Sequence, residues 1–159
     1  MNAVLVTFSE FFGQFRDSMG QPATPQSPGR QPGPIAAFQR GYAQGWVPSP
    51  GGGGRWERPS FPFIIYPVLL PGFAQSAMDF IEIWDWWPGR PGFMGLVQDV
   101  MGQIKTAVPE AGIILRLDDD SGLVRVQRGN PFTMFPPSDE SDAAIVRGAA
   151  NLVFSGYVV

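Results

Sequence analysis

Two apolar segments that follow one another in the sequence constrain the fold most. They are Phe63–Leu70 and Met78–Trp87, and a short link containing Pro71-Gly72 separates them. Both segments are rich in β-branched and aromatic residues, which suit a pleated sheet packed on a core, and Pro-Gly is typical of a turn. The pattern therefore predicts two neighbouring strands at the centre of a sheet.

Two amphipathic segments flank this pair and predict helices. In Ala3–Phe15 the apolar residues recur at steps of three and four, with Asn2 as N-cap and Gly20 as a stop. In Phe93–Ala107 they form one stripe, which Pro109 ends. A chain of 159 residues, 44% of them hydrophobic, is long enough for one domain with one core. The predicted fold class is α+β, with a mainly antiparallel sheet packed by two helices and a long Gly/Pro-rich arm.

A β-hairpin is predicted after the second helix. Ile113–Leu117 and Leu123–Gln127 are strand-like and flank Asp118–Gly122, in which Gly122 is available for a positive φ. Three consecutive Asp residues in this turn raise the alternative of a calcium loop. The alternating ligands and the distant bidentate Glu of an EF-hand are missing, so we expect a solvated hairpin tip.

The C-terminal segment Ala143–Val159 predicts one long, half-buried strand. Apolar residues of one parity recur along it, as a half-buried strand requires: Val146, Ala150, Leu152, Phe154 and Val158. As a single strand the segment would extend for about 50 Å, well beyond the common strand length. We therefore expect either bulges at Gly148 and Gly156 or an end that pairs with another subunit.

Residues 20–59 differ from the rest of the chain, because Pro and Gly are scattered through them without a sustained period. An irregular segment of this length is uncommon inside a compact domain and is typical of a functional arm or a linker. Linkers are usually poor in aromatic residues, whereas this segment contains Phe38, Tyr42, Trp46 and Trp56. We expect parts of it to become ordered against another surface. The expected organisation is a helix belonging to the same domain (1–19), an arm or extended loop (20–59) and an α+β core (60–159).

Composition excludes several classes of site. The chain has no Cys and no His, which rules out thiol nucleophiles, disulfides, zinc-finger spacings and histidine general bases. A formal charge of −3 and a pI of about 4.8 argue against a general nucleic-acid-binding surface. No segment offers about 18 uninterrupted apolar residues, and the N-terminus lacks the features of a signal peptide. We expect no membrane partner and a soluble protein in the cytoplasm when it is made.

Three carboxylates in the second apolar segment are the candidates for catalysis. Asp79, Glu82 and Asp85 are close enough along a strand to suggest the carboxylate pair of a glycosidase. Strand parity places Asp79 and Asp85 on one face and Glu82 on the other. Sugar rings could stack on three nearby tryptophans, which are equally common at protein interfaces: Trp84, Trp86 and Trp87. An exposed or interface strand is the simpler interpretation, and a carbohydrate-binding module stays open as an alternative.

An ordered set of short motifs runs from residue 59 to the C-terminus, with the predicted second helix and hairpin between them. The set comprises Pro59–Pro67, Ile83–Asp85, Pro109–Gly112, Arg128–Phe132, and Ala144–Arg147 followed by Asn151–Val153. Together with the N-terminal helix, this order resembles the tail terminator proteins of long-tailed bacteriophages. The resemblance rests on the order of the whole set.

The resemblance implies an α+β protein whose subunits join, usually as a hexameric ring, at the head-proximal end of the tail tube. Such a ring stops tube polymerisation and presents a surface to the head-completion or connector proteins. The implied partners are other copies of the chain, the tail tube protein and the connector, and passive contact with DNA in the ring lumen is compatible with this arrangement. No catalysis, cofactor or metal is implied. The implied location is the head–tail junction of the virion, and another head–tail connector or neck protein is the alternative.

Aromatic and arginine side chains beside the predicted strands and in the arm are the candidates for the partner interface, because interface centres are enriched in these residues. Trp84 and Phe132 are also natural core residues, and Arg90 and Arg128 could pair with nearby carboxylates. The candidates are Phe38, Tyr42, Trp46, Trp84, Trp86, Trp87, Arg90, Arg128 and Phe132.

Overall fold

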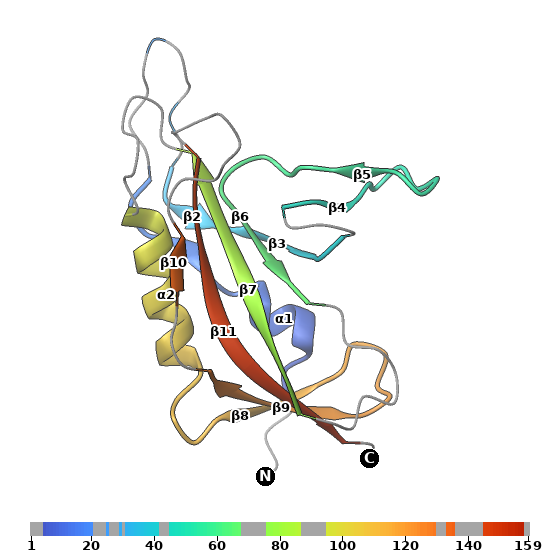
Figure 1. The fold of residues 1–159 in the computed structure, drawn as a ribbon. Coiled ribbons are helices and arrows are strands. Elements are labelled where there is room, and N and C mark those ends of the chain that lie inside the picture. Colours follow the sequence, from blue (N-terminus) through green and yellow to red (C-terminus); the bar gives the residue numbers. More distant parts are fainter. Residues whose placement is uncertain are drawn as a thin grey trace.

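A seven-stranded sheet with two helices on one of its faces forms the body of the protein (Figure 1). The computed structural model describes residues 5–20, 25, 29, 31–41, 45–67, 76–86, 95–129, 133–135 and 145–157. These residues confirm the predicted α+β class and the mainly antiparallel sheet, in which β3 and β6 form the parallel pair. The order is β3-β6-β7-β11-β9-β8, with β10 beside β11. The strands are β3 (Ala36–Gln39), β6 (Phe63–Tyr66), β7 (Ser76–Trp86), β8 (Ile113–Arg116), β9 (Leu123–Arg128), β10 (Thr133–Phe135) and β11 (Ile145–Tyr157).

β7 and β11 form the long central ribbon of the sheet. The whole of β7 pairs with β11 in one unbroken register that begins with Ile145 opposite Trp86. The second edge of β11 pairs first with β10 and then with β9, and its register with β9 is also continuous. The predicted bulges at Gly148 and Gly156 are therefore wrong. The strand can run for 13 residues because neighbouring strands satisfy its backbone along both edges.

The two apolar segments form neighbouring strands, as predicted. β6 pairs antiparallel with β7, and β7 lies between β6 and β11. Side chains of β7 alternate between two apolar environments, since Ile81 and Ile83 join the core on the helix side whereas Trp84 joins a second cluster on the other face. Burial on both faces explains why the sequence of these strands reads as an apolar run.

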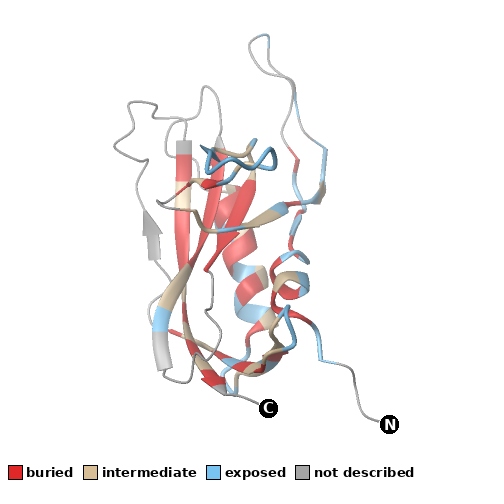
Figure 2. Ribbon diagram, turned by 90° about the vertical axis from the view of Figure 1, so that its right-hand side faces the viewer, coloured by how far each residue is buried: buried red, intermediate tan, exposed pale blue. Residues whose placement is uncertain are grey.

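Both helices enclose the main core against the same face of the sheet (Figure 2). α2 (Gly95–Ala107) confirms the predicted second helix, and β11 buries the described residues of the predicted parity, whereas Val158 lies outside the described residues. The buried stripe residues of α2 are Leu96, Val97, Val100 and Ile104, and they face Val146, Ala150, Leu152 and Phe154 of β11 across one continuous cluster.

α1 (Phe8–Phe12) is shorter than the helix predicted over Ala3–Phe15. Thr7 is its N-cap, and the Thr7 hydroxyl accepts a hydrogen bond from the Glu10 amide at 3.2 Å. Gly13 is the C-cap, so the helix ends well before Gly20. A helix of this length is marginal in isolation, and its three buried phenylalanines show that packing holds it.

The residues before α1 extend along the edge of the sheet instead of beginning the helix. The Val6 carbonyl accepts a hydrogen bond from the Arg116 amide at 3.0 Å, and Thr7 forms an isolated parallel bridge to the same residue of β8. This long-range pairing replaces the first helical turns that the apolar period predicts. The predicted Asn2 cap lies outside the described residues.

The predicted hairpin is confirmed, because β8 and β9 pair antiparallel and the three Asp residues of the turn are exposed. The positive φ of 60° is at Asp120 and not at Gly122, and Asp is one of the few residues other than Gly that enter this region routinely. Asp120 forms an ion pair with Arg116. Asp118 accepts hydrogen bonds from the Ser9 amide at 3.1 Å and the Ser9 hydroxyl at 2.8 Å, so the turn also holds α1.

Four short strands lie among the described residues of the Gly/Pro-rich segment 20–59. β2 (Gly33–Pro34) pairs with β1 (Arg16–Asp17), and β3 adds to the sheet beside β6. β4 (Val47–Pro48) and β5 (Trp56–Glu57) form a hairpin, which projects on the side of the molecule opposite α2 (Figure 1).

α2 carries Gly102 on its exposed side, where an added methyl group would meet no atom within 4 Å. Gly in a helix interior costs about 0.5–1 kcal/mol relative to Ala, because its backbone loses more freedom on folding. Gly102→Ala is therefore expected to raise the free energy of unfolding by about this amount in urea denaturation. Gly112→Ala should lower it, since φ is +81° and the new Cβ would lie 2.9 Å from the Val126 carbonyl. A loss of stability in Gly102→Ala would contradict the open position of this residue.

Candidate functional site

A second, smaller apolar cluster lies on the face of the sheet opposite the helices. Its buried members are Val47, Phe63, Ile65 and Trp84, and Phe38 and Phe61 pack against them. The rings of Phe63 and Trp84 are stacked, with 5.9 Å between their centroids. Because Val47 belongs to β4, the cluster fixes the base of the β4–β5 hairpin on the sheet.

Glu82 ties the same region to the centre of the sheet. Glu82 is only 3% exposed, and its Oε1 accepts hydrogen bonds from the Gly45 amide at 2.9 Å and the Trp84 indole at 3.1 Å. Its Oε2 accepts a hydrogen bond from Arg40 Nε at 2.9 Å. Gly45 has a φ of +78°, and a Cβ there would lie 2.9 Å from the Trp84 ring, so only glycine brings the backbone this close. Three donors thus compensate for the burial of this charge.

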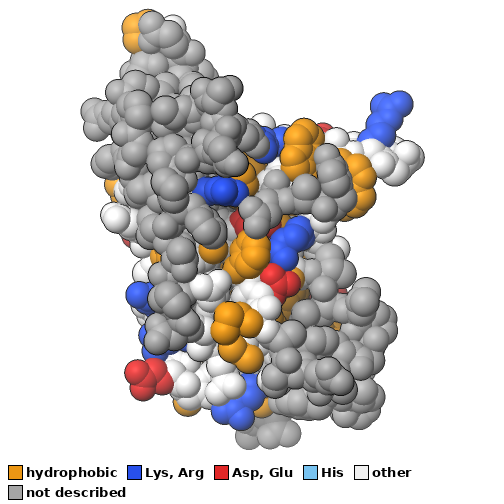
Figure 3. All heavy atoms as spheres, viewed as in Figure 1, with side chains coloured by type: hydrophobic (Ala, Val, Ile, Leu, Met, Phe, Trp, Pro, Cys, Tyr) orange, Lys and Arg blue, Asp and Glu red, His pale blue; other side chains and the backbone are white. Residues whose placement is uncertain are grey.

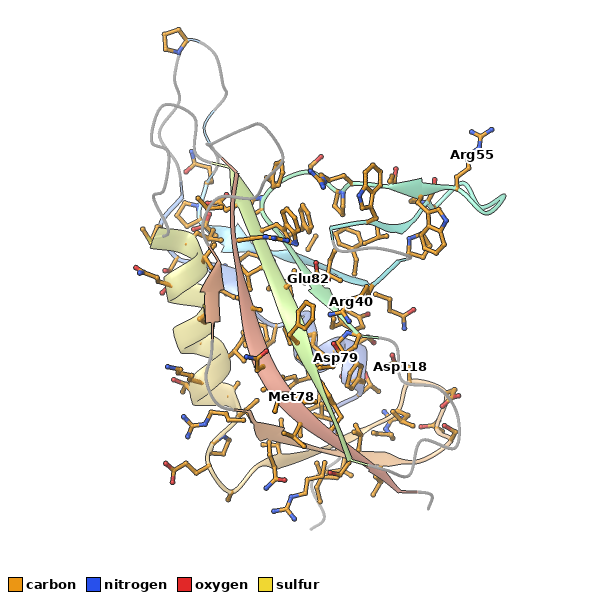
Figure 4. All side chains as sticks on the ribbon, viewed as in Figure 1. Arg40, Arg55, Met78, Asp79, Glu82 and Asp118 are labelled. Carbon is orange, nitrogen blue, oxygen red and sulfur yellow. The ribbon has the colours of Figure 1, made fainter. Side chains whose placement is uncertain are left out.

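Arg40 joins Glu82 to Asp79, and the three side chains converge beside β7 (Figure 4). Arg40 Nη1 donates to Asp79 at 2.8 Å and Nη2 donates to the Phe80 carbonyl at 2.6 Å. Burial alone would lower the pKa of Arg40, but the hydrogen bonds and charges of Asp79 and Glu82 outweigh burial and raise this pKa above its usual value. The guanidinium fork thereby connects two carboxylates that strand parity places on opposite faces.

This arrangement makes Glu82 a clamp. Both of its oxygens accept hydrogen bonds from the protein, and Asp79 is bound to Arg40. Asp85, the third carboxylate singled out in the sequence, is also buried, at 2% exposure. The geometry therefore holds a chain segment on the sheet, and it does not present Glu82 to a substrate.

Two arginines also help to hold the base of the β4–β5 hairpin on the sheet, through contacts with the buried Trp84 ring. The guanidinium carbon of Arg58 lies 5.1 Å from the ring centroid and that of Arg147 lies 5.3 Å from it. Arg58 also lies 5.4 Å from the centroid of Trp46. Cation–π contacts contribute about 0.5–2 kcal/mol each, depending on their exposure. Here they connect the residues on both sides of the hairpin to β7 and β11.

The hairpin projects beyond these anchors. The Ser49 amide donates to the Arg55 carbonyl at 3.0 Å, and Gly52, Gly53 and Gly54 have φ values of 71°, 72° and 71°, which favour glycine. Trp56 is 42% exposed, and Arg55 points away from the body (Figure 4). The surface view shows a basic side chain at the end of the projection and hydrophobic side chains along it (Figure 3). The hairpin is therefore an exposed element with a fixed base.

Three of the predicted interface residues lie at the base of this hairpin. Phe38 packs against the second cluster, and Trp46 is partly buried beside Arg58. Trp84 is 2% exposed, so its contacts are made within the chain. These residues support the projecting element and do not form its tip.

Among the remaining predicted candidates, Arg128 has a described side chain. Arg128 ends β9 opposite Leu152 of β11 and is partly buried. Trp86 ends β7 opposite Ile145, but its side chain is not among those described. The other four lie outside the described residues: Tyr42, Trp87, Arg90 and Phe132.

The sequence-based interpretation missed the anchoring roles of Arg40, Arg58 and Glu82, and it missed the exposed Arg55. One signal was present, because Glu82 stands inside an apolar strand where a carboxylate needs a buried partner. The identity of that partner is a tertiary property, since Arg40 lies 42 residues away along the chain.

Comparison of the chain with models of known protein families, with characterised proteins and with solved structures gave no match. In the part of the chain that is described, no group of His, Cys, Asp and Glu side chains is arranged to hold a metal ion. The helices described above do not reach the length and apolar character needed to cross a membrane.

Proposed function

We propose that the protein is a structural subunit of a ring at the head-proximal end of a phage tail, where it stops tail-tube polymerisation and joins the tail to the head connector. The observation that carries the proposal is the projecting β4–β5 hairpin, whose base is fixed by Glu82 while its tip stays exposed. An element held in place before binding loses little conformational entropy on contact with a partner. The resemblance to tail terminator proteins indicates the assembly in which the hairpin would make this contact, which is the ring at the head-proximal end of the tail tube.

A ring accounts for termination by its geometry. Head-to-tail contacts between unlike surfaces close into a ring when the rotation between subunits closes, and no free lateral surface then remains for further growth. One face of the ring complements the end of the tube, and the other meets the connector. Axial growth stops because the outer face does not resemble a tube subunit, and DNA makes only passive contact in the lumen.

The charged side chains of β7 support an assembly role better than a carbohydrate-binding or hydrolytic one. Glu82 and Asp79 are bound by Arg40, and the Trp84 ring is buried under the hairpin base. A sugar site needs an accessible aromatic face and a carboxylate free to exchange a proton. Neither Glu82 nor Trp84 meets that requirement.

The mass of the purified protein across concentration tests the proposal. Native mass spectrometry and light scattering are expected to give a closed ring, hexameric as the resemblance implies, and its addition should arrest the growth of tail-tube protein. A protein that stays monomeric and leaves tube growth unchanged would refute the ring. Glycan binding by a monomer, lost in Trp86→Ala or Trp87→Ala, would replace the proposal with a carbohydrate-binding module.

A further inference from the structure

An open groove of about 780 Å³ lies on the helix side of the sheet, between α2 and the residues that follow α1. Apolar atoms, including those of Phe15 and Ala107, form the larger part of its lining, and amide, hydroxyl and carboxylate groups form the rest. Its polar lining residues are Gln14, Gln98, Asp99, Gln103 and Thr106. The Gln14 and Gln103 amides donate to carbonyls of their own chain, so the lining suits a slim segment that packs on the apolar atoms and carries a basic group for Asp99.

Asp99 gives this groove a negative charge in a fixed position. Its Oδ2 accepts hydrogen bonds from the Ser18 hydroxyl at 2.8 Å and the Gln103 amide at 3.0 Å, and Gln103 also donates to the Arg16 carbonyl at 2.7 Å. None of the ion pairs between described residues involves Asp99. The Asp99 carboxylate is therefore oriented by hydrogen bonds but not paired with a positive charge. A cation that enters the groove would provide that partner.

Gly102 lines the groove without a side chain. It is a lining residue in the middle of α2, and the packing of its own chain does not require glycine there, since an added methyl group would meet no atom within 4 Å. The helix nevertheless gives up the stability that Ala would provide. A close approach by a backbone from outside the chain is a physical reason for glycine at this position.

The tip of the β4–β5 hairpin is complementary to this groove in shape and charge. Residues Gly51–Gly54 have no side chains, and the amides of Gly51 and Gly52 donate to the Ser49 hydroxyl and carbonyl within the hairpin, so the exposed backbone that remains for a partner lies mainly at Gly53 and Gly54. A Cβ built on Gly52, Gly53 or Gly54 would meet no atom within 4 Å, which shows that the tip stands clear of its own body. Arg55 follows directly, is exposed, and takes no part in the ion pairs between described residues. The tip thus offers a slim backbone and a cation.

We propose that the Gly51–Gly54 tip of one subunit docks in the α2 groove of the next subunit, with Arg55 facing Asp99; this contact rests on the proposed ring. The β4–β5 hairpin lies at the right of Figure 1 and α2 at the left, and in Figure 2, seen from the hairpin side, α2 lies behind the sheet. A subunit therefore cannot fill its own groove. Two unlike surfaces on opposite sides produce a head-to-tail contact in which each subunit donates one tip and accepts one.

Cysteine cross-linking tests the contact, because the chain has no native cysteine. Oxidation of the double variant Gly51→Cys/Thr106→Cys with copper phenanthroline is expected to give a ladder of linked subunits that ends at the ring size on a non-reducing gel. Gly51 does not have a positive φ, and Thr106 is exposed, so both positions accept the change. The control Gly51→Cys/Ile114→Cys places the second thiol on an exposed position of β8 outside the groove and should give no ladder.

Charge reversal tests the pairing of Arg55 with Asp99. Arg55→Glu alone and Asp99→Arg alone are each expected to weaken association about tenfold or more, measured by light scattering across concentration. The double reversal should restore most of the loss. Asp99→Arg also removes acceptors from Ser18 and Gln103, so thermal unfolding of each variant is compared to verify that the subunit remains folded.

The outcomes separate this contact from the ring itself. A closed ring that neither cross-links between positions 51 and 106 nor weakens in Arg55→Glu would refute the docking contact and leave the ring standing. Cross-linked dimers or open chains without closure would support the contact and refute the ring. A protein that is monomeric and does not cross-link at any concentration would refute both.

Discussion

Replacing Glu82 with Ala is expected to lower the free energy of unfolding by about 3 kcal/mol, at the lower end of the range for breaking a buried charge pair. The change removes the acceptors of Arg40, the Gly45 amide and the Trp84 indole together. Arg40 keeps Asp79 as a partner, and its side chain is 20% exposed, which limits the loss. Urea denaturation measures the effect, and faster cleavage by trypsin after Arg55 would report the release of the hairpin.

Asp79→Asn is the matched control for Glu82→Ala. The Asp79 side chain is 33% exposed, and Arg40 would keep its bond to Glu82 in this variant. The expected loss is below about 1 kcal/mol, as for exposed ion pairs. Equal losses of unfolding free energy in the two variants would mean that Arg40 holds the hairpin segment on the sheet with either carboxylate as its partner. The central role of Glu82 would then have to be abandoned.

Phe12→Ala is expected to lower the free energy of unfolding by about 3–5 kcal/mol, because a fully buried ring leaves a cavity as well as lost contacts. Phe12 is 0% exposed and lies 4.9 Å from Phe8, 5.0 Å from Phe11 and 5.4 Å from Tyr66, between ring centroids. α1 is only 5 residues long, so it depends on these contacts more than a long helix would. Urea denaturation checks the magnitude.

Glu10→Ala provides the comparison for Phe12→Ala within the same helix. Glu10 is exposed in the first turn, and the variant retains the hydrogen bond from its backbone amide to the hydroxyl of the N-cap residue Thr7. The change should therefore stay within about 0.5 kcal/mol of the parent. If Phe12→Ala were as mild as Glu10→Ala, α1 would have to be peripheral to the core.

Segments whose period matches a half-buried element could be predicted from the sequence. α2 has a buried and an exposed side over 13 residues, and β11 buries one parity of its apolar residues while most of the others are half-buried, so local periodicity is enough to assign both. The β8–β9 hairpin was equally readable, because a run of Asp and Gly separates two strand-like segments. The exact geometry of its turn could not be predicted from the sequence, since the positive φ is at Asp120 and not at Gly122.

Elements that depend on distant partners could not be assigned in this way. The start of α1 is decided by pairing between Val6–Thr7 and Arg116, more than 100 residues away, and apolar spacing contains no trace of it. β2, β4 and β5 are each 2 residues long, which is too short for any period to emerge. Pro and Gly mark these segments as irregular without saying what they pack against.

The candidate site was predictable in its residue types more than in its geometry. Phe38, Trp46 and Trp84 were singled out as aromatic contacts, and they lie together, but beneath the hairpin and not at its tip. The exposed Arg55 follows four glycines that read only as a flexible stretch. The groove joins side chains from α2 and from the residues after α1, and no local sequence pattern links the two.

The hairpin and α2 are fastened to the same pair of strands. Glu82 of β7 binds the hairpin segment on one face, and α2 packs on β7 and β11 from the other. In the proposed assembly, the twist of this pair therefore sets the angle between the donated tip and the accepting groove. That angle determines how many subunits complete a turn. A substitution inside the ribbon could thus change the stoichiometry of the ring while leaving every contact residue untouched.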